Sequence, residues 1–600
     1  MKYLSVREAS TARAQSRHAE CAGSPGRSFK RAAIARLLAA AGVGAGLGAT
    51  AFAQQAPVAP AVPQAGQVTP RDLRPDVPPK PPATVPQAAP ERAPAQADKL
   101  FVDVKAIVVD DGFPEFAAAT EALLPPHTGH RVPVSEFYKL AAEVEAIYRD
   151  GGYPLVRVLV PPQAVLDGGT LHLTVLDGFI ERVDVNAVAP AGRASVAAMM
   201  AALVGRHHLK NSALERALTL AGRVPGVTLR SALGPGKALG GAVLVLEGES
   251  VAYGASFGGD NHLTGQLGPW ETTLQVRLNQ PTQRGEQVYG YVSSGPDWSQ
   301  TLIRDTEVRR VIGGGVLIPL GVSGLQLDPE YTWSDTKPRT PPGTLATESR
   351  FERFTLRLSY PLILDHEQEL TLTGALEATD QSNASPQFDF TFTDDRLRVG
   401  RLTLDWKGAV PTGQLHVYAI GSQGSGGLGA RKASEVAQSF TGFSRVGMDP
   451  AFTKLELGAT LDQPLPASLD SALTVRGQLA KGVLPSSELF SIDGDDALST
   501  FTSGAISDDE GWTAREELSR PFDLSISGVA MSLAPYGFGA IGRTDSKILP
   551  AAVQGLVSSY GVGLRSSWKQ FSLDAEYGHR QAHPDDMNGN QFFVKAQVQF

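Results

Sequence analysis

The chain has 600 residues and a formal net charge of −8 at pH 7, so it lacks the basic surface that nucleic-acid binding requires. Its one cysteine, Cys21, leaves no disulfide framework and no thiol pair for redox chemistry. A mean hydropathy of −0.10 does not exclude a membrane protein, because strands that alternate polar and apolar residues hide their membrane character from averages.

The N-terminal region is predicted to hold an export signal and a linker. Basic residues at positions 30–36 precede a small and apolar run that ends in the A-x-A sequence 51–53, which is typical of a cleavable signal peptide over residues 1–53. Residues 54–98 are rich in Pro, Ala and Gln and bury too little apolar surface to offset the entropy of ordering. We expect an extended linker there.

Two small α/β modules are expected next, over residues 99–178 and 179–249. Each has the order β-α-α-β-β. The expected elements of the first module are residues 101–109, 113–124, 135–150, 155–160 and 170–176, and those of the second are residues 180–188, 193–203, 212–222, 227–232 and 241–247. Ser135 is the expected N-cap of one helix, and Ser212 with Glu215 the expected capping box of another.

Residues 250–600 alternate with period two, which predicts strands with one apolar and one polar face. Outside the signal no stretch reaches eighteen uninterrupted apolar residues, so membrane residence requires a barrel. The final strand places Phe592, Val594, Ala596, Val598 and Phe600 on its apolar face. A terminal aromatic is usual in bacterial outer-membrane barrels, and Phe600 is the predicted assembly signal. A soluble β-sandwich would also alternate, but it explains neither the export signal nor the terminal phenylalanine.

Several segments resemble the two-partner secretion transporters, the TpsB proteins that export filamentous haemagglutinins and haemolysins. They are GYPLVRVLVPPQ (152–163) and GGTLHLTVLDGFIE (168–181) for a first POTRA domain, LERAL (214–218), VPGV (224–227) and LGPG (233–236) for a second, and DN (260–261), TG (264–265) and SELFSIDG (487–494) for the barrel. The resemblance covers residues 99–600. It implies two α+β POTRA modules, an all-β transmembrane barrel of 16 antiparallel strands, and an exported partner.

The sequence departs from that family at the sixth extracellular loop. Family members carry V-R-G-Y or V-R-G-F at the loop tip, and its Arg meets an Asp in a wall strand that reads F-x-D-x-G. Here the loop motif falls on Leu498, Ser499, Thr500 and Phe501, and the wall motif on Phe538, Ala540 and Gly542. Ser499 therefore replaces the Arg and Ala540 replaces the Asp. Losing both partners of a buried ion pair can leave stability nearly unchanged. The paired replacement therefore favours a coherent variant of the family over a damaged gene.

Two further expectations follow from the resemblance. Arg476 lies in a V-R-G sequence before the loop, and we interpret this segment as barrel wall with Arg476 facing the lumen. Some family members place a plug helix inside the pore, but Pro70 and Pro75 bracket the one linker segment that could form a helical turn. No long plug helix is expected.

Catalytic and metal-binding interpretations are weaker. The sequence at 254–258 matches the G-x-S-x-G nucleophile elbow, but no helix follows it. His207 and His208 have no further ligand at metal-site spacing, so an exposed loop pair is expected. The acidic residues near the sixth loop lack EF-hand spacing and are interpreted as a solvated loop: Asp493, Asp495, Asp496, Asp508, Asp509 and Glu510. We expect no enzyme activity, no metal and no cofactor.

The sequence predicts an outer-membrane transporter with periplasmic POTRA domains that recognises an unfolded exoprotein and conducts it through the barrel. Recognition is assigned to the POTRA strands and residues that accompany them: Tyr153, Val156, Val158, Val227 and Leu229. Other expected partners are outer-membrane lipid and the barrel assembly machinery, with no nucleic acid. The alternatives are an assembly or insertion factor of the same superfamily and a passive porin.

Overall fold

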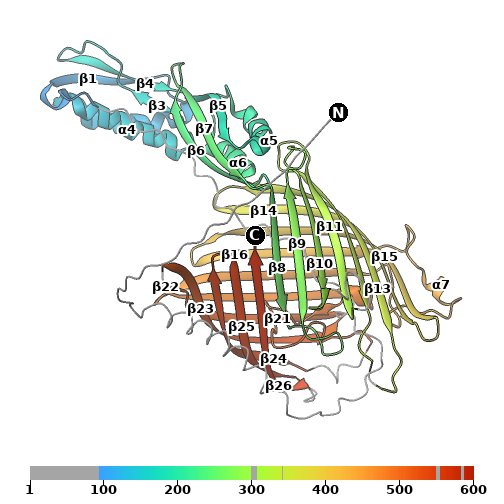
Figure 1. The fold of residues 1–600 in the computed structure, drawn as a ribbon. Coiled ribbons are helices and arrows are strands. Elements are labelled where there is room, and N and C mark those ends of the chain that lie inside the picture. The colour runs from blue at the N-terminus through green and yellow to red at the C-terminus, as the bar shows by residue number, and fades with distance from the viewer. Residues whose placement is uncertain (1–92, 299–306, 341, 527, 549–554, 583–586) are drawn as a thin grey trace, which may run out of the picture. The chain divides into compact units, whose positions relative to one another are not determined.

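The computed structural model describes residues 93–600, except for 299–306, 341, 527, 549–554 and 583–586 (Figure 1). The predicted signal peptide and nearly all of the linker, including the segment considered for a plug helix, lie outside the described residues. Among the described residues, no helix is both long enough and apolar enough to span a bilayer.

The first module is built on a four-stranded sheet in the order β2-β1-β4-β3, in which β1 and β4 are parallel. Its elements are η1 (Ala97–Lys99), β1 (Phe101–Asp110), η2 (Pro114–Phe116), α3 (Ala117–Leu123), η3 (Pro125–His127), β2 (Arg131–Pro133), α4 (Val134–Asp150), β3 (Arg157–Leu159) and β4 (Gly169–Leu176). The short strand β2 was not predicted. Helix α4 packs its apolar stripe, with Phe137, Leu140 and Val144, into the core beneath the sheet.

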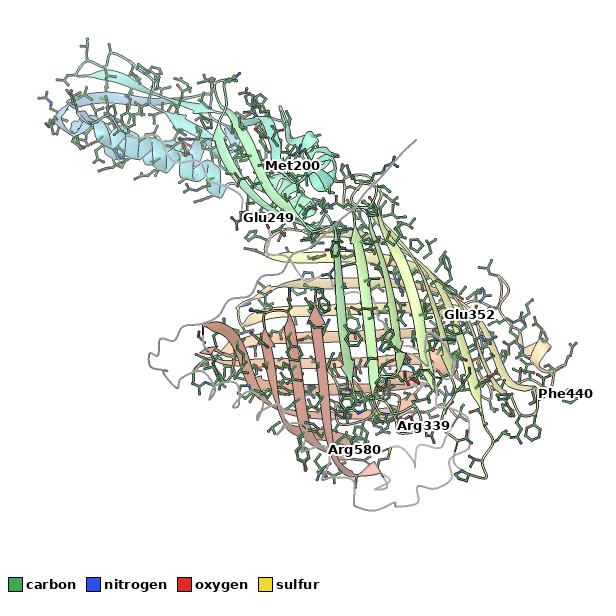
Figure 2. All side chains as sticks on the ribbon, viewed as in Figure 1. Met200, Glu249, Arg339, Glu352, Phe440 and Arg580 are labelled. Atoms are coloured by element: carbon green, nitrogen blue, oxygen red, sulfur yellow. The ribbon has the colours of Figure 1, made fainter. Side chains whose placement is uncertain are left out.

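The second module has a three-stranded sheet in the order β5-β7-β6, with β5 and β7 parallel. Its elements are β5 (Phe179–Val188), α5 (Pro190–Met200), η4 (Ala201–Leu203), α6 (Asn211–Gly222), β6 (Val227–Pro235) and β7 (Gly241–Ser250). Met200, labelled in Figure 2, lies fully buried in its core with Leu214 and Leu246. The module order therefore matches the prediction.

Both predicted helix caps are wrong. Helix α4 begins at Val134, after Pro133, so Ser135 lies in its first turn and its side chain caps nothing. Helix α6 begins at Asn211, whose side chain donates to Glu215 (Nδ2–Oε1 2.7 Å), so Glu215 is occupied and no capping box forms with Ser212. The helix expected from residue 113 begins as the 3-10 turn η2 and becomes α-helical at Ala117.

The remaining strands form a closed antiparallel barrel (Figure 1). They are β8 (Tyr253–Asp260), β9 (Glu271–Asn279), β10 (Gln287–Ser294), β11 (Arg309–Pro319), β12 (Gln326–Thr336), β13 (Glu348–Leu364), β14 (Gln368–Ser385), β15 (Phe390–Val410), β16 (Gly413–Gly424), β17 (Thr453–Leu465), β18 (Leu469–Lys481), β21 (Glu510–Ser519), β22 (Phe522–Ile526), β23 (Val529–Asp545), β24 (Val557–Trp568), β25 (Phe571–Gln581) and β26 (Gly589–Gln599). Strands β21 and β22 pair with successive parts of β23 and count as one, which gives the expected 16.

The barrel closes where the last strand, β26, meets the first, β8, with register Lys595↔Asp260 through Gln599↔Ser256. Pairing continues to the end of the chain, because the Phe600 amide donates to the Ala255 carbonyl at 2.8 Å. The Phe600 side chain is 68% exposed. Its predicted use as an assembly signal stays a prediction.

The strand faces agree with a membrane barrel. Apolar residues of the alternating strands are exposed, including Phe354, Leu457 and Leu479, while their polar neighbours are enclosed. Lumen-facing charges pair across the wall, as Arg357 does with Asp328 (3.2 Å) and Glu330 (2.5 Å). The polar wall encloses the space into which the sixth loop folds.

Candidate functional site

The sixth loop, residues 482–509, folds back into the barrel. It contains η6 (Ser486–Glu488) and two short strands, β19 (Phe490–Ser491) and β20 (Ser507–Asp508), which pair with each other as a stalk. Beyond the stalk the loop tip is enclosed: Leu498 and Thr500 are 0% exposed, and Ser499 is 3% exposed. A loop tip in solvent would not be buried in this way, so the wall must hold it.

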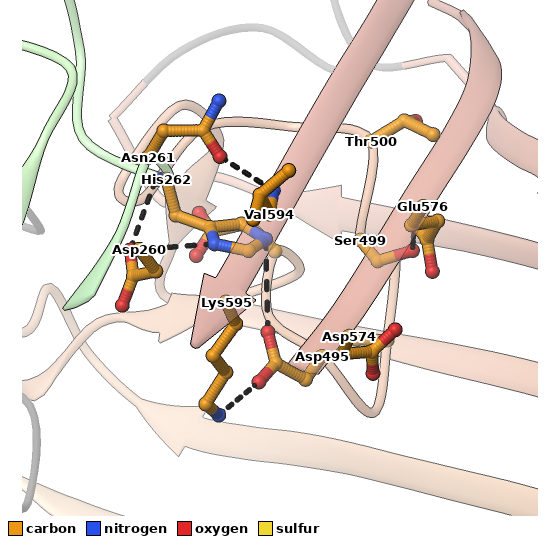
Figure 3. A network of polar contacts seen from close by, with 12 residues as sticks. Asp260, Asn261, His262, Asp495, Ser499, Thr500, Asp574, Glu576, Val594 and Lys595 are labelled. Carbon is orange, nitrogen blue, oxygen red and sulfur yellow. Dashed lines mark hydrogen bonds and ion pairs between the residues drawn. The ribbon is translucent and has the colours of Figure 1, made fainter. Parts of the chain in front are cut away.

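Ser499 lies between a cation and an anion of the wall. Arg515 of β21 donates to Ser499 Oγ (Nη1–Oγ 2.7 Å), and Ser499 Oγ donates to Glu576 of β25 (2.5 Å; Figure 3). The Arg515 guanidinium also reaches Glu576 (3.3 Å) and Glu517 (3.2 Å). Hydrogen bonds to charged groups are stronger than those between neutral groups. The Ser499 hydroxyl therefore makes two strong hydrogen bonds and links Arg515 to Glu576.

The predicted loop and wall positions come together. Leu498, Phe501 and Ala540 share one buried apolar cluster. Gly542 leaves the room that Leu498 occupies, since a Cβ there would lie 2.9 Å from Leu498 Cδ1. Phe538 lies under the Arg515 guanidinium, with 4.1 Å between the guanidinium carbon and the ring centre.

Thr500, the remaining loop position, also contacts the wall. Its Oγ1 donates to Ser559 Oγ of β24 (2.8 Å). Its carbonyl oxygen accepts from Arg580 of β25 at 3.5 Å, and the Arg580 guanidinium also lies over the Phe501 ring, 5.6 Å from its centre. Arg580 is labelled in Figure 2. Each residue of the loop motif therefore has its own wall partner.

Around the predicted loop motif, the charged groups lie on the wall. The cations belong to the wall, and the loop offers a hydroxyl and main-chain carbonyls. Arg476 of β18 faces the lumen as predicted and donates to the carbonyls of Ser491 (3.1 Å) and Asp493 (2.9 Å) in the loop. The roles of Arg515 and Glu576 were missed in the sequence, although Glu576 stood on the polar side of an alternating strand.

A buried ion cluster anchors the start of the loop. Glu488 accepts from Arg401 of β15 (2.6 Å and 3.0 Å) and pairs with Lys454 of β17 (3.0 Å). Burial alone would raise the pKa of Glu488, but these two cations lower it to about 2. The carboxylate is thus ionised at any physiological pH and fixes the loop base to two strands.

A second ion pair anchors the end of the loop. Asp509 is fully buried and accepts both guanidinium nitrogens of Arg445 (2.5 Å and 2.9 Å), as well as the amides of Leu484 and Lys547. Burial would raise the pKa of Asp509, yet the hydrogen bonds from Arg445 and these amides hold it below its ordinary value. From the sequence, the acidic residues near the sixth loop are interpreted as solvated. This interpretation is wrong for Asp509, because its buried carboxylate fixes the end of the loop through Arg445.

The loop also bridges the barrel seam (Figure 3). Asp495 pairs with Lys595 of β26 (2.8 Å) and lies 3.8 Å from His262, which follows β8. His262 stacks on Phe593 of β26 with ring centres 4.0 Å apart. Beyond the last ladder pair, the Asn261 side chain replaces main-chain pairing by binding the amide of Val594 (2.7 Å) and the carbonyl of Phe592 (3.0 Å).

The residues predicted for client recognition lie inside the two modules. Tyr153, Val156 and Val158 belong to the first hydrophobic core and Val227 to the second, while Leu229 packs against the second core. The first four side chains are therefore buried in this conformation, and Leu229 is partly buried. Their role in recognition stays a prediction, and the accessible features are the sheet edges, of which β6 is a long one.

The catalytic and metal readings gain no support from the described residues. Residues 254–258 lie within strand β8, without the strand-to-helix turn of a nucleophile elbow. His207 and His208 are exposed as expected and both approach Asp177 (3.3 Å and 2.8 Å). Across the part of the chain that the structure describes, no three His, Cys, Asp or Glu side chains gather as metal ligands.

Comparison with known proteins agrees with this architecture. The family model of haemolysin secretion/activation protein ShlB/FhaC/HecB matches residues 240–566, and that of the ShlB-type POTRA domain matches residues 102–178. The chain is 24% identical to haemolysin transporter protein ShlB of Serratia marcescens over 421 residues, or 69% of this chain and 70% of ShlB. It is 22% identical to haemolysin transporter protein HpmB of Proteus mirabilis over 476 residues, or 78% of this chain and 80% of HpmB.

Solved structures show the same fold. CdiB from Escherichia coli superposes with a TM-score of 0.66 at 18% identity, and CdiB from Acinetobacter baumannii with a TM-score of 0.58 at 15% identity. Each alignment covers 86% of this chain and 94% of the other. The chain belongs to the ShlB/FhaC/HecB family of haemolysin secretion/activation proteins, outer-membrane β-barrel transporters whose POTRA domains lie in the periplasm.

Proposed function

We propose that the protein recognises an unfolded haemolysin-type exoprotein through its POTRA domains and conducts it outward through the barrel lumen. The observation that carries this proposal is the sixth loop, which occupies a polar lumen and whose tip offers only neutral hydroxyl and main-chain groups to its wall partners Arg515, Glu576 and Ser559. A polar wall lets an extended chain pass without sticking. A loop held in this way is a removable obstruction.

The edges of the POTRA sheets are the proposed docking surface. Among the described strands, β6 pairs with β7 alone, and we infer that its other edge accepts an extended client by strand addition. Main-chain hydrogen bonds make such binding tolerant of sequence. The short strands β2 and β3 of the first module offer three residues each.

Photocrosslinking during secretion tests this assignment. The full-length protein would be co-expressed with a haemolysin-type exoprotein, with a photoreactive residue at Arg230, which is exposed on β6, or at Ala198, which is exposed on α5 as the matched control. The client should crosslink at Arg230 and not at Ala198. Equal crosslinking at both positions, or secretion that continues without the POTRA domains, would contradict the proposal.

Two alternatives predict different outcomes. An assembly factor of the same superfamily would alter the insertion of other outer-membrane proteins when it is deleted, and it would export no client. A passive porin would conduct ions at the same level with or without the POTRA domains, and it would export no client. The POTRA pair and the lumenal loop favour export over either alternative.

A further inference from the structure

The outer face of the barrel carries an apolar groove of about 1110 Å³ that spans strands β12 to β18. Three outward-facing glycines form its floor: Gly374, Gly400 and Gly421. Leucines form its rims and are strongly exposed, as Leu376 at 66% and Leu479 at 63% show. One row across the strands reads Leu358, Gly374, Leu402, Gly421, Leu455 and Leu479 in successive register pairs.

The floor glycines have no local reason to be glycine. None of the three has a positive φ, and a Cβ at any of them would meet no atom within 4 Å. A larger side chain would therefore fit the backbone and fill the groove. What the glycines provide is depth, which separates this face from an ordinary lipid-facing wall of packed side chains.

The groove becomes polar at its extracellular end. The adjoining row passes from Leu376 and Gly400 to Gln423, Thr453 and Lys481, where β16, β17 and β18 reach the loops. Thr453 Oγ1 already donates to Gln423 Oε1 (2.7 Å). Lys481 is exposed and, among the described residues, has no carboxylate partner.

We propose that this groove holds an acyl chain of lipopolysaccharide, the phosphorylated lipid of the outer leaflet, with Lys481 beside a phosphate. The apolar trough lies on the outer face of the barrel, and the cation stands at its extracellular end, where β18 reaches the loop. Charge complementarity at one end and acyl packing along the floor together favour this lipid over a second copy of the chain. The site lies outside the lumen and is independent of the export proposal.

Native mass spectrometry of the full-length protein in detergent micelles tests the site. The probes are hexa-acylated lipid A with both phosphates and the same lipid without phosphate. The wild type should retain the phosphorylated form about fivefold better, as expected for one basic residue near an anionic lipid surface. Gly400→Leu with Gly421→Leu should lose most of both lipids, whereas the Lys481→Gln variant should retain them equally.

Gly539→Leu is the matched control, because Gly539 also faces outward into open space but lies on β23, away from the groove. It should retain lipid A as the wild type does. Equal retention by the groove-filled and control variants would overturn the proposal, and so would a wild type that ignores the phosphates. Light scattering that shows a dimer dissociated by the groove-filling pair would instead make this face a self-association surface and also refute lipid binding.

Discussion

Removing the Arg515 charge is the most direct test of how the sixth loop is held. Arg515→Met keeps the length of the side chain while deleting its contacts to Ser499, Glu517 and Glu576. Breaking a buried ion pair costs about 3–5 kcal/mol. We expect a loss near 3 kcal/mol, because Glu576 keeps Tyr536 as a donor (3.2 Å). The free energy of unfolding would be measured in denaturant with the protein refolded into lipid vesicles.

A double-mutant cycle then isolates the loop. Ser499→Ala removes two hydrogen bonds to charged groups, each worth about 1.5–3 kcal/mol. Because the Arg515–Ser499 bond is lost in both single variants, the double variant should be less destabilised than the sum by about 1.5 kcal/mol. In planar bilayers, each single variant should also raise the fraction of time that the channel is open.

The control is Arg357→Met. Arg357 is another enclosed lumenal arginine with two carboxylate partners, but both partners lie on the neighbouring strand β12. This variant should also lose stability, add independently to Ser499→Ala and leave channel opening unchanged. If the effects of Arg515→Met and Ser499→Ala add within about 0.5 kcal/mol, the loop tip does not lie against Arg515. The description of the contacts between the loop tip and the barrel wall, here called the loop lock, would then be wrong.

Three further outcomes are expected. The pKa of Glu488 is lowered from 4.5 to about 2, so the stabilising effect of its carboxylate is complete above pH 4.5 and is lost as the pH falls toward 2. The free energy of unfolding, measured across this pH range, should show the loss. Glu488→Gln should abolish this pH dependence. Leu140 is 0% exposed, so Leu140→Asp places an unpaired charge in the core and should unfold the first POTRA domain and stop secretion while the barrel stays intact. The control variant Leu166→Asp, at a position that is 79% exposed, should secrete normally. Equal secretion by the two variants would contradict the recognition role of this domain. Ser499→Arg should lower the heat stability of the barrel, because it overpacks a pocket that already holds the Arg515 guanidinium. Adding Ala540→Asp should restore part of that stability through an interaction of about 0.5–3 kcal/mol between the two new side chains. Strictly additive effects of the two substitutions would exclude this interaction.

The strand pattern was predictable because period-two alternation follows directly from strand geometry. Residues such as Phe354 and Leu479 are exposed on the outer face as the alternation requires. The helix starts were not predictable, since Pro133 and Asn211 compete with the expected serine caps at the same sites. N-terminal signals of neighbouring residues overlap, and only the folded contacts decide between them.

The loop lock could be predicted only in part. Counting along the chain assigned Ser499 to the loop motif and Ala540 to the wall motif, and this assignment stays a prediction. The structure brings the two segments together through Leu498, Phe501 and Ala540. The sequence could not reveal that Arg515 is the wall cation that contacts Ser499. That contact depends on how deeply the loop enters the barrel and on the register of β21 with β23. The available signal was an inward Arg and an inward Glu on two strands with no assigned partners.

The placement of charge on the wall sets the free-energy cost of releasing the loop tip. When the cation belongs to the wall, Arg515 keeps Glu517 and Glu576 after the tip leaves, so no buried charge loses its partner. Withdrawal then breaks hydrogen bonds worth about 1.5–3 kcal/mol each, and spares the 3–5 kcal/mol of a broken buried pair. The pair between Asp495 and Lys595 adds little, since both side chains are about half exposed.

The two ends of the loop are held differently from its tip. Glu488 and Asp509 are buried carboxylates that would lose Arg401 and Arg445 if the whole loop left the barrel. Separating either pair would strand charges in a confined site, which is strongly unfavourable. We therefore expect the base of the loop to stay fixed when the tip is released from the wall. On the proposed function, a client in the lumen would compete for the hydroxyl and carbonyl contacts of the tip, and we expect the loop to bend where β19 and β20 pair.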